Sequence, residues 1–372
     1  MTTDAATRSG RLPSRPPARR RGPLVRLLLW AAVLLLLGLL GLAGFVAWLW
    51  WRAEMSNVGQ LGFANQPKIP PLLEPRVDGA GRKVFDLRLQ AGTSELVAGR
   101  PTATWGANGA YLGPTLRAAR GDRVVVHVAN ALPEPTTIHR AGRHRRRVAG
   151  AAAPHHPCAV VTGERAEVVA EFQPGERVVL RSFQPDLGLD NFQGRFAGGD
   201  DSFDLLQVRA GAELTRSPEV PPRLARHVRL DQDEAARTRR FELDGGSAIN
   251  GRPMDMGRID HAVTVNTIEV WEVANRSGNL HNFHVHDVQF KVVDHAGGPP
   301  PPTAAGWKDT VVVPPGATLR LVVRFTDYTD PAMPYMFHCH LLQHEDNGMM
   351  GQFVVVQPGQ PPSSPPSHQH RG

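Results

Sequence analysis

Near its C-terminus the chain reads Met336-Phe-His-Cys-His-Leu-Leu-Gln-His-Glu-Asp-Asn-Gly-Met-Met350. The lone thiol of Cys339 stands between His338 and His340, and His344 and Met349 follow within the same stretch. A blue-copper electron-transfer site needs two imidazoles and one thiolate in a trigonal plane, with a weak axial thioether. The stretch therefore predicts such a site, to be completed by a second histidine from elsewhere in the chain.

The second histidine comes from Leu280-His-Asn-Phe-His-Val-His-Asp287, which follows an apolar, β-branched run. Side chains alternate along a strand with period two, so His284 and His286 should point to the same face. The same alternation sends Cys339 to one face and the histidines on either side of it to the other. A metal on Cys339 would then be joined through two short covalent paths to metals bound behind it.

Together these two motifs, HNFHVH and HCHLLQHEDNGMM, resemble the C-terminal domain of the multicopper oxidases, the group of laccase, bilirubin oxidase and bacterial copper-efflux oxidase. Two independent motifs with matching residue types and spacings disfavour the alternative of ordinary core or surface histidines. The resemblance implies a type 1 copper held by His281, Cys339, His344 and Met349. It also implies a trinuclear oxygen-reducing cluster, with His284 as a type 2 ligand and His286, His338 and His340 as type 3 ligands.

The composition is that of a globular, loop-rich protein. Of 372 residues, 41% are hydrophobic and 21% charged, with 37 glycines and 33 prolines, which excludes a disordered chain. The formal net charge is +7, but the arginines gather at the N-terminus and in residues 140–147. Because no basic face interleaved with aromatic residues accompanies them, we expect no nucleic-acid partner.

An apolar run near the N-terminus predicts one transmembrane helix. Residues 1–26 form a basic tail, and Leu27 to Trp51 carry no charge, a length of about 37 Å as a helix and enough to cross a bilayer. The basic tail predicts that the N-terminus lies inside the cell and later residues outside, on a single-pass cell-membrane protein. The alternative is an exported protein with a cleaved signal, including a twin-arginine type, but the run is longer than an ordinary signal core.

After a Pro-rich linker over residues 52–80, residues 81–139 alternate in short β-branched runs split by turns. This spacing predicts an antiparallel β-sandwich. Residues 105–116 and 120–124 resemble the opening of the family's first cupredoxin domain. The family continues with an HxHG motif, of which only His139 is present here, since Ala141 stands at the second histidine's place. By the resemblance, His139 would pair with His284 as a type 2 ligand.

Residues 140–160 form an anomalous junction rich in Arg, Ala and Gly, and residues 161–215 resemble the end of the family's middle domain. We interpret the junction as an internal deletion or a reading-frame slip, with a basic loop as the alternative. His144, His155 and His156 are expected to be solvated loop residues, and Cys158 an incidental thiol.

Residues 224–358 resemble a complete C-terminal cupredoxin domain, and residues 359–372 form a Pro/Ser/His-rich tail expected to be disordered. The predicted strands of this domain are residues 240–244, 267–273, 309–313 and 319–323. The fold class is therefore all-β, with cupredoxin-like Greek-key sandwiches, complete at the C-terminus and incomplete in the first and middle domains, behind one transmembrane helix.

The resemblance implies an oxidoreductase. Type 1 copper would take single electrons from a phenolic or other organic donor, or from Cu(I), and O2 would be the final acceptor. Cys339 would carry the electrons, and Glu345 matches a position suited to proton delivery, although an exposed carboxylate is the alternative. Only five of the family's eight trinuclear histidines can be assigned. Two other functions therefore stay open: an electron-transfer module with type 1 copper only, or an inactive, truncated oxidase. The oligomeric state is left open.

Overall fold

Two compact units make up the chain in the computed structural model, one formed by residues 1–60 with 148–372 and the other by residues 61–147. The structure describes residues 22–67, 69–119, 121–133, 160–165, 170–218, 230–326 and 328–364. His139, Cys158 and nearly all of the predicted junction lie outside these residues.

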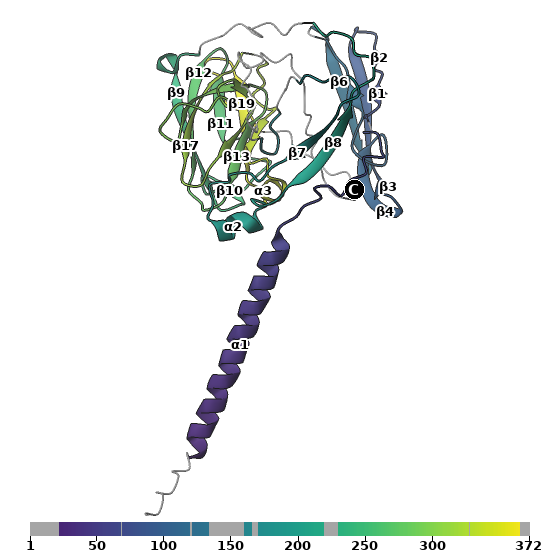
Figure 1. Cartoon of the computed structure of the whole chain (residues 1–372). Helices are drawn as coiled ribbons and strands as arrows, with labels where there is room; N and C mark the ends of the chain where they lie inside the picture. The colour runs from purple at the N-terminus through teal and green to yellow at the C-terminus, as the bar shows by residue number, and fades with distance from the viewer. Residues whose placement is uncertain are drawn as a thin grey trace, which may run out of the picture. The chain divides into compact units, whose positions relative to one another are not determined.

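A sandwich of two sheets forms the C-terminal part of the first unit (Figure 1). Within the described residues one sheet has six strands in the order β10-β9-β12-β17-β14-β15, and the other has five in the order β11-β19-β18-β13-β16. Most neighbours in both sheets are not consecutive in sequence, as in Greek-key sandwiches. The all-β prediction is confirmed. The strands are β9 (Arg237–Asp244), β10 (Ala248–Ile249), β11 (His261–Thr264), β12 (Ile268–Asn275), β13 (His281–Val285), β14 (Phe290–His295), β15 (Trp307–Lys308), β16 (Thr310–Val313), β17 (Thr318–Arg324), β18 (Tyr335–His338) and β19 (Met350–Val356).

The core between the two sheets is built around Trp271 of β12. Its ring centroid lies 4.6 Å from that of Phe241 on β9 and 5.7 Å from that of Phe353 on β19. Phe283 and Phe337, each one residue before or after a predicted metal ligand, are also buried in this core. The packing that stabilises the sandwich therefore also holds the backbone of the histidine-bearing strands β13 and β18.

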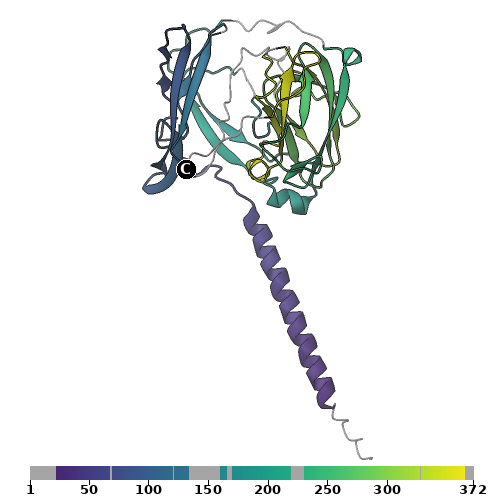
Figure 2. The same ribbon diagram turned by 180° about the vertical axis from the view of Figure 1, so that it is seen from behind.

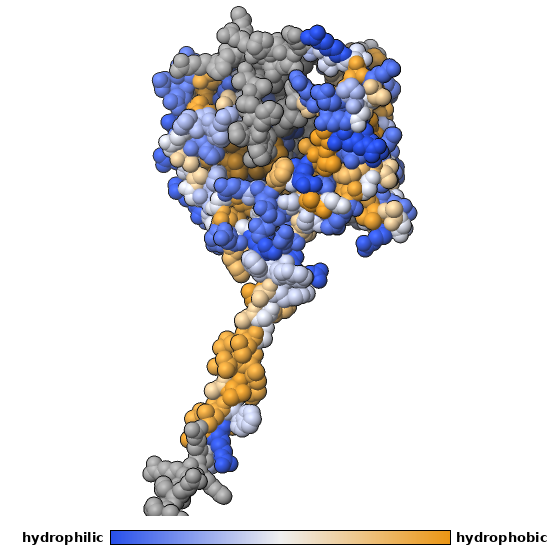
Figure 3. Space-filling model, in the orientation of Figure 1, coloured by the Kyte–Doolittle hydropathy of each residue, from blue (hydrophilic) through white to orange (hydrophobic). Residues whose placement is uncertain are grey.

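α1 (Pro23–Ala53) is a single helix of 31 residues whose apolar side chains are exposed along its length. Figure 2 shows it as one unbroken coil, and Figure 3 shows the hydrophobic colour over most of its surface. Among the described helices it is the one long and apolar enough to cross a membrane. An N-terminal apolar helix of this kind is present in membrane anchors and in signal sequences.

The chain leaves α1 in hydrogen-bonded contact with the start of strand β8 (Phe203–Arg209), which pairs antiparallel with β7 (Arg177–Ser182). The Met55 amide donates to Asp201 Oδ1 at 2.8 Å, and the Gly59 amide to Asp204 Oδ2 at 2.8 Å. Asn57 exchanges two hydrogen bonds with Asp204. Residues 55–59 are thus fixed to the folded unit. Short helices α2 (Asn191–Phe196) and α3 (Leu342–Asp346) and the 3-10 turn Gln232–Glu234 complete it.

The second unit is organised around the 15-residue strand β3 (Lys83–Val97). It pairs with β2 (Arg76–Val77) and β4 (Arg100–Ala107) in antiparallel fashion and with β6 (Val124–Asn130) in parallel. A second, two-stranded parallel pair joins β1 (Leu72–Leu73) to β5 (Thr115–Leu116). Phe85 and its neighbour Val84 are buried here.

Candidate metal centre

Three potential ligand atoms meet at the end of the sandwich core. Nδ1 of His281 on β13 and Nδ1 of His344 on α3 lie 3.1 Å apart. Sγ of Cys339, just after β18, lies 3.7 Å from the first and 3.5 Å from the second. The four residues of the predicted type 1 site come close through the backbone as well. The Cys339 amide donates to the Met349 carbonyl at 3.1 Å, and the Met349 amide donates to the His344 carbonyl at 2.9 Å.

This triangle has the size that a transition metal requires. Its three sides place a central point about 2.0 Å from each of the two nitrogens and the sulfur, close to the distances of about 2.0–2.3 Å typical of imidazole and thiolate ligands. One thiolate and two imidazoles in a plane are the donor set of a blue-copper site. The residues present therefore fit a copper ion.

Two neighbours orient the imidazoles. The Ser277 hydroxyl lies 2.9 Å from Nε2 of His281, so this hydrogen bond leaves Nδ1 directed at Cys339. On the other side, Gly246 lies so close to the His344 ring that a Cβ there would stand 2.9 Å from its Cδ2 atom. A glycine is therefore required for the ring to take this position. Such contacts around ligands fix ring orientation in metal sites.

Burial sets the protonation of the three donors. Desolvation lowers the pKa of His281 to about 4, with a further contribution from His344, and desolvation also lowers the pKa of His344. Both imidazoles are thus neutral at pH 7 with a lone pair to share. Desolvation raises the pKa of the Cys339 thiol, so a cation must displace its proton to bind, as is usual for thiolate ligands.

A second histidine cluster lies on the opposite faces of the same strands. His284 of β13 is paired in register with His338 of β18, and ligand atoms of His284, His286 and His338 lie within 4.8 Å of one another. The His340 ring centroid lies 5.3 Å from that of His284 and 5.1 Å from that of His338. Strand alternation predicts this separation of Cys339 from the flanking histidines.

His284 is held through its Nδ1 atom, which lies 2.9 Å from the Asp309 carbonyl and 2.8 Å from the Thr310 hydroxyl. Its Nε2 is thereby left to face the cluster. His286 and His338 approach through their Nε2 atoms, at 3.2 Å. The second nitrogen of His338, Nδ1, lies 3.2 Å from the Cys339 carbonyl, so its Nε2 is directed at His286, an arrangement suited to a metal.

Asn282 ties this cluster to a distant segment of the chain. Its side-chain amide donates to the Thr162 carbonyl at 2.9 Å, and its oxygen accepts the His340 backbone N–H. In the same turn, Gly163 has φ +84° and packs on the His340 ring, where a Cβ would lie 2.6 Å from Cδ2. Sequence reasoning missed these residues. Asn282 stands inside the histidine motif, but nothing local indicates its partner 120 residues away.

Glu345 follows His344 on α3, and its side chain lies beside the second cluster. Its Oε2 atom is 3.5 Å from Nδ1 of His338 and 3.7 Å from Nδ1 of His340. Desolvation raises the pKa of this carboxyl group, while His340 opposes the shift. The side chain is partly buried, so the alternative of a fully exposed carboxylate does not apply. His139, the remaining predicted ligand, lies outside the described residues.

Comparison with known proteins gives a consistent result. Two family models, both described as multicopper oxidase, match residues 88–171 and 219–359. The multicopper oxidase mco of Staphylococcus aureus is 23% identical over 81% of this chain and 95% of the relative, and that of Staphylococcus haemolyticus is 41% identical over 52% and 37%. The crystal structure of a multi-copper oxidase from Pediococcus acidilactici shares the fold with a TM-score of 0.56, at 22% identity over 81% of this chain and 93% of that one.

These alignments are uneven along the chain. The chain spans little more than a third of the length of the more identical Staphylococcus haemolyticus relative. The Staphylococcus aureus alignment runs over 429 residues, which exceeds the 372 residues of this chain. That relative therefore contains stretches that have no counterpart here.

Proposed function

The chain belongs to the multicopper oxidase family, and on this premise we propose that it takes single electrons from a phenolic, other organic or Cu(I) donor at a type 1 copper. His281, Cys339 and His344 would hold the ion, with Met349 as a fourth, weaker ligand. The observation that carries the proposal is the triangle of two Nδ1 atoms and one Sγ, sized for a metal, in which His281 and Cys339 are buried and His344 is partly buried. Copper bound there supplies one-electron redox chemistry.

The chain itself connects this site to the second cluster. Cys339 is bonded through the backbone to His338 and His340, whose rings lie in the cluster with His284 and His286. Each path from Cys339 to a flanking histidine runs through covalent bonds alone. We propose that electrons leave Cys339 by this path, and that Glu345 holds a proton at Oε2 for transfer beside His338 and His340.

The final acceptor in the family is O2, and oxygen reduction by this chain is part of the proposal. A specific observation favours a second candidate function, an electron-transfer module with type 1 copper alone. Among the described residues the second cluster holds four histidines, whereas the family's cluster uses eight. The Staphylococcus aureus relative contains stretches that this chain lacks, which also favours the electron-transfer module. An inactive, truncated oxidase is the third candidate.

We propose that the missing stretches reflect an internal deletion or a reading-frame slip within residues 140–160. Amplifying and resequencing the genomic region tests this hypothesis. An uninterrupted, transcribed frame across codons 139–161 would exclude the slip and leave the deletion or a basic loop.

The experiment for the function uses the full chain purified in detergent. Copper per chain, visible and electron paramagnetic resonance spectra, and O2 uptake with a one-electron phenolic donor are measured together. About four coppers with O2 uptake support the oxidase, whereas one blue copper without uptake supports the electron-transfer module. A soluble, correctly folded chain that binds no copper would refute both.

Two variants test whether the blue absorption and the bound copper depend on Cys339. Cys339→Ser should remove the blue absorption and one copper per chain, because the thiolate is the charged ligand. His295→Gln changes a histidine of β14, outside both clusters, and should leave both readouts unchanged. If Cys339→Ser keeps the blue band, the copper lies elsewhere.

We also propose that α1 is an uncleaved, single-pass anchor, with the N-terminus in the cytoplasm and the folded units outside. The hydrogen bonds from residues 55–59 to Asp201 and Asp204 support retention, because they make the end of the helix continuous with the folded unit. N-terminal sequencing of the mature protein and its resistance to alkaline carbonate extraction test the anchor. A mature chain that starts beyond residue 53 would establish the cleaved signal instead.

A further inference from the structure

The last turn of α1 is hydrogen-bonded to a side chain that is distant in sequence. Arg195 of α2 donates from Nε to the Trp50 carbonyl at 2.6 Å and from Nη2 to the Trp51 carbonyl at 3.5 Å. The final carbonyls of a helix have no partner within the helix, so a cation with several donors stabilises them. The Arg195 guanidinium also lies 4.1 Å from the centre of the Trp50 ring. The two helices are therefore joined at this point.

Two carboxylates complete the environment of Arg195. Glu54 accepts from Nη2 at 3.0 Å and Asp200 accepts from Nη1 at 2.6 Å. Arg195 itself is only 9% exposed. Every nitrogen of the guanidinium thus has an acceptor, in a geometry that a lysine cannot reproduce. This polar cluster directly follows the charge-free run that ends at Trp51, which places it at the boundary between lipid and water if α1 spans a bilayer.

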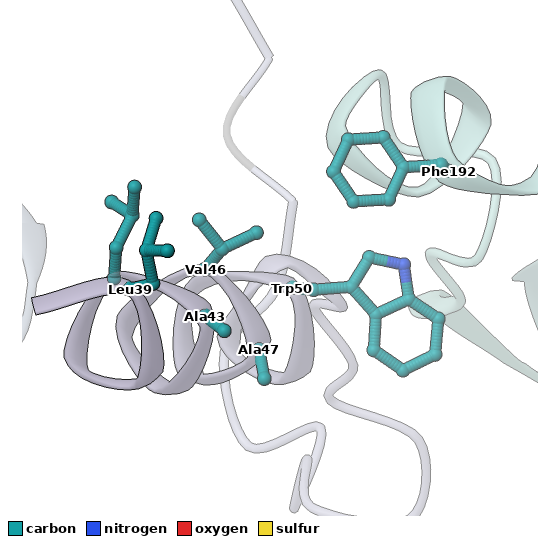
Figure 4. A pocket seen from close by; sticks show the side chains of 7 residues that line it. Leu39, Ala43, Val46, Ala47, Trp50 and Phe192 are labelled. Carbon is teal, nitrogen blue, oxygen red and sulfur yellow. The ribbon is translucent and has the colours of Figure 1, made fainter. Parts of the chain in front are cut away.

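α2 presents two aromatic side chains beside this boundary. Phe192 and Phe196 are 53% and 50% exposed, and their ring centroids lie 5.3 Å apart. Figure 4 shows Phe192 next to Trp50, where both line a groove that continues along α1 past Val46 to Leu39. All the α1 residues of this groove belong to the charge-free run. If α1 spans a bilayer, Phe192 therefore lies at the level of the end of the apolar run.

We propose that α2 is seated in the membrane interface, and that lipid acyl chains of the bilayer spanned by α1 fill the groove between α1 and Phe192. The inference rests on the proposed membrane anchor. Continuity of the groove with the lipid-facing surface of α1 identifies the occupant, since that surface is covered by acyl chains wherever the helix is in a bilayer. Aromatic residues at the interface and an apolar face beside charged residues are typical of interfacial helices. Arg195 acts as a positioning residue that fixes the depth of α2.

The test uses the full chain in phosphatidylcholine nanodiscs that contain a lipid with a photoreactive diazirine on its acyl chain. After illumination, cross-linked residues are located by peptide mass spectrometry. We expect adducts on α1 and on Phe192 or Phe196, several-fold above those on Tyr328, an aromatic residue 81% exposed in the loop after β17. Replacing Phe192 and Phe196 by serine should remove the α2 adducts, and Tyr328→Ser should not.

The outcomes separate this inference from the anchor. Adducts on α1 without adducts on α2 would overturn the seating of α2 and leave the anchor intact, whereas no adducts on α1 would overturn the anchor itself. Adducts on α2 in nanodiscs that hold a single chain, but not in nanodiscs that hold two, would identify a second copy as the occupant and overturn the proposal.

A second variant tests Arg195 without removing an aromatic residue. Arg195→Lys keeps the charge but cannot bond to both helix carbonyls and both carboxylates. We expect several-fold fewer α2 adducts, unchanged α1 adducts and an unchanged visible spectrum, which shows that the sandwich is folded. Equal α2 adducts in this variant would show that Arg195 does not position the helix.

Discussion

Replacing Glu269 by glutamine should lower the free energy of unfolding of the sandwich, because the substitution breaks a buried ion pair. Glu269 on β12 accepts two hydrogen bonds from Arg239 on β9, at 2.6 and 2.8 Å, and a third from the Trp271 indole at 2.9 Å. The side chains of the pair are 9% and 4% exposed. Glutamine fills the same volume but has no charge and turns an NH2 group toward one of these donors.

The size of the loss in the free energy of unfolding depends on the Arg239 charge that remains after the substitution. Arg239 keeps its bond to the Ala262 carbonyl, at 2.7 Å, but its charge is no longer compensated inside the protein. Removing one partner of a buried ion pair typically costs about 3–5 kcal/mol of the free energy of unfolding. Replacing both residues by methionine removes the unpaired charge as well, and we expect that double variant to lie within about 1 kcal/mol of the wild type.

Urea unfolding followed by tryptophan fluorescence measures the effect, because Trp271 lies against the pair. Glu272→Gln is a matched control on the same strand, since Glu272 pairs at 3.2 Å with Arg240 and at 3.5 Å with Arg320, whose side chains are 83% and 39% exposed. An exposed pair contributes about 1 kcal/mol or less. If Glu269→Gln and Glu272→Gln lose the same free energy of unfolding, or if the double methionine variant is no more stable than Glu269→Gln, the reasoning is wrong.

Three further predictions concern the site and its surroundings. Gly163→Ala should cost about 1–2 kcal/mol for its left-handed backbone and should displace His340, weakening copper at the second cluster while the blue band stays. Gly175→Ala has a similar φ of +73° with open space around it and should affect stability only; equal copper loss in both would exclude steric contact as the cause. Burial lowers the pKa of His261 to about 4 in the folded chain. As the pH falls, this imidazole is therefore protonated in the unfolded chain before it is protonated in the folded one. The free energy of unfolding should fall by up to about 3 kcal/mol between pH 6.5 and pH 4. Urea unfolding at several pH values checks this fall, and His261→Gln should reduce it by that share, since the buried His281 adds a fall of its own over the same range. Removing copper with a chelator should lower the melting temperature of the wild type by more than that of Cys339→Ser, which lacks the copper at the first site.

The donor residues could be predicted because they lie on two short stretches where strand alternation decides which way each side chain points. The predicted strands at residues 240–244 and 319–323 correspond to β9 and β17, each longer by a few residues at one or both ends. Strand β3 (Lys83–Val97) has 15 residues and is longer than the short runs expected over residues 81–139, because its pairing with β4 extends it beyond its own hydrophobic pattern.

Contacts between distant segments could not be predicted, for a physical reason. The Asn282 side chain reaches Thr162, and Arg195 reaches the end of α1, yet neither residue breaks the local pattern in which it lies. Helix α2 escaped prediction because it has only six residues, and its one local signal is Asp190, which caps it by accepting from the Phe192 and Gln193 amides. Local periodicity fixes which face of a strand a residue occupies. It carries no information on which remote segment covers that face, and in this chain the covering segments position His340 and hold the end of α1.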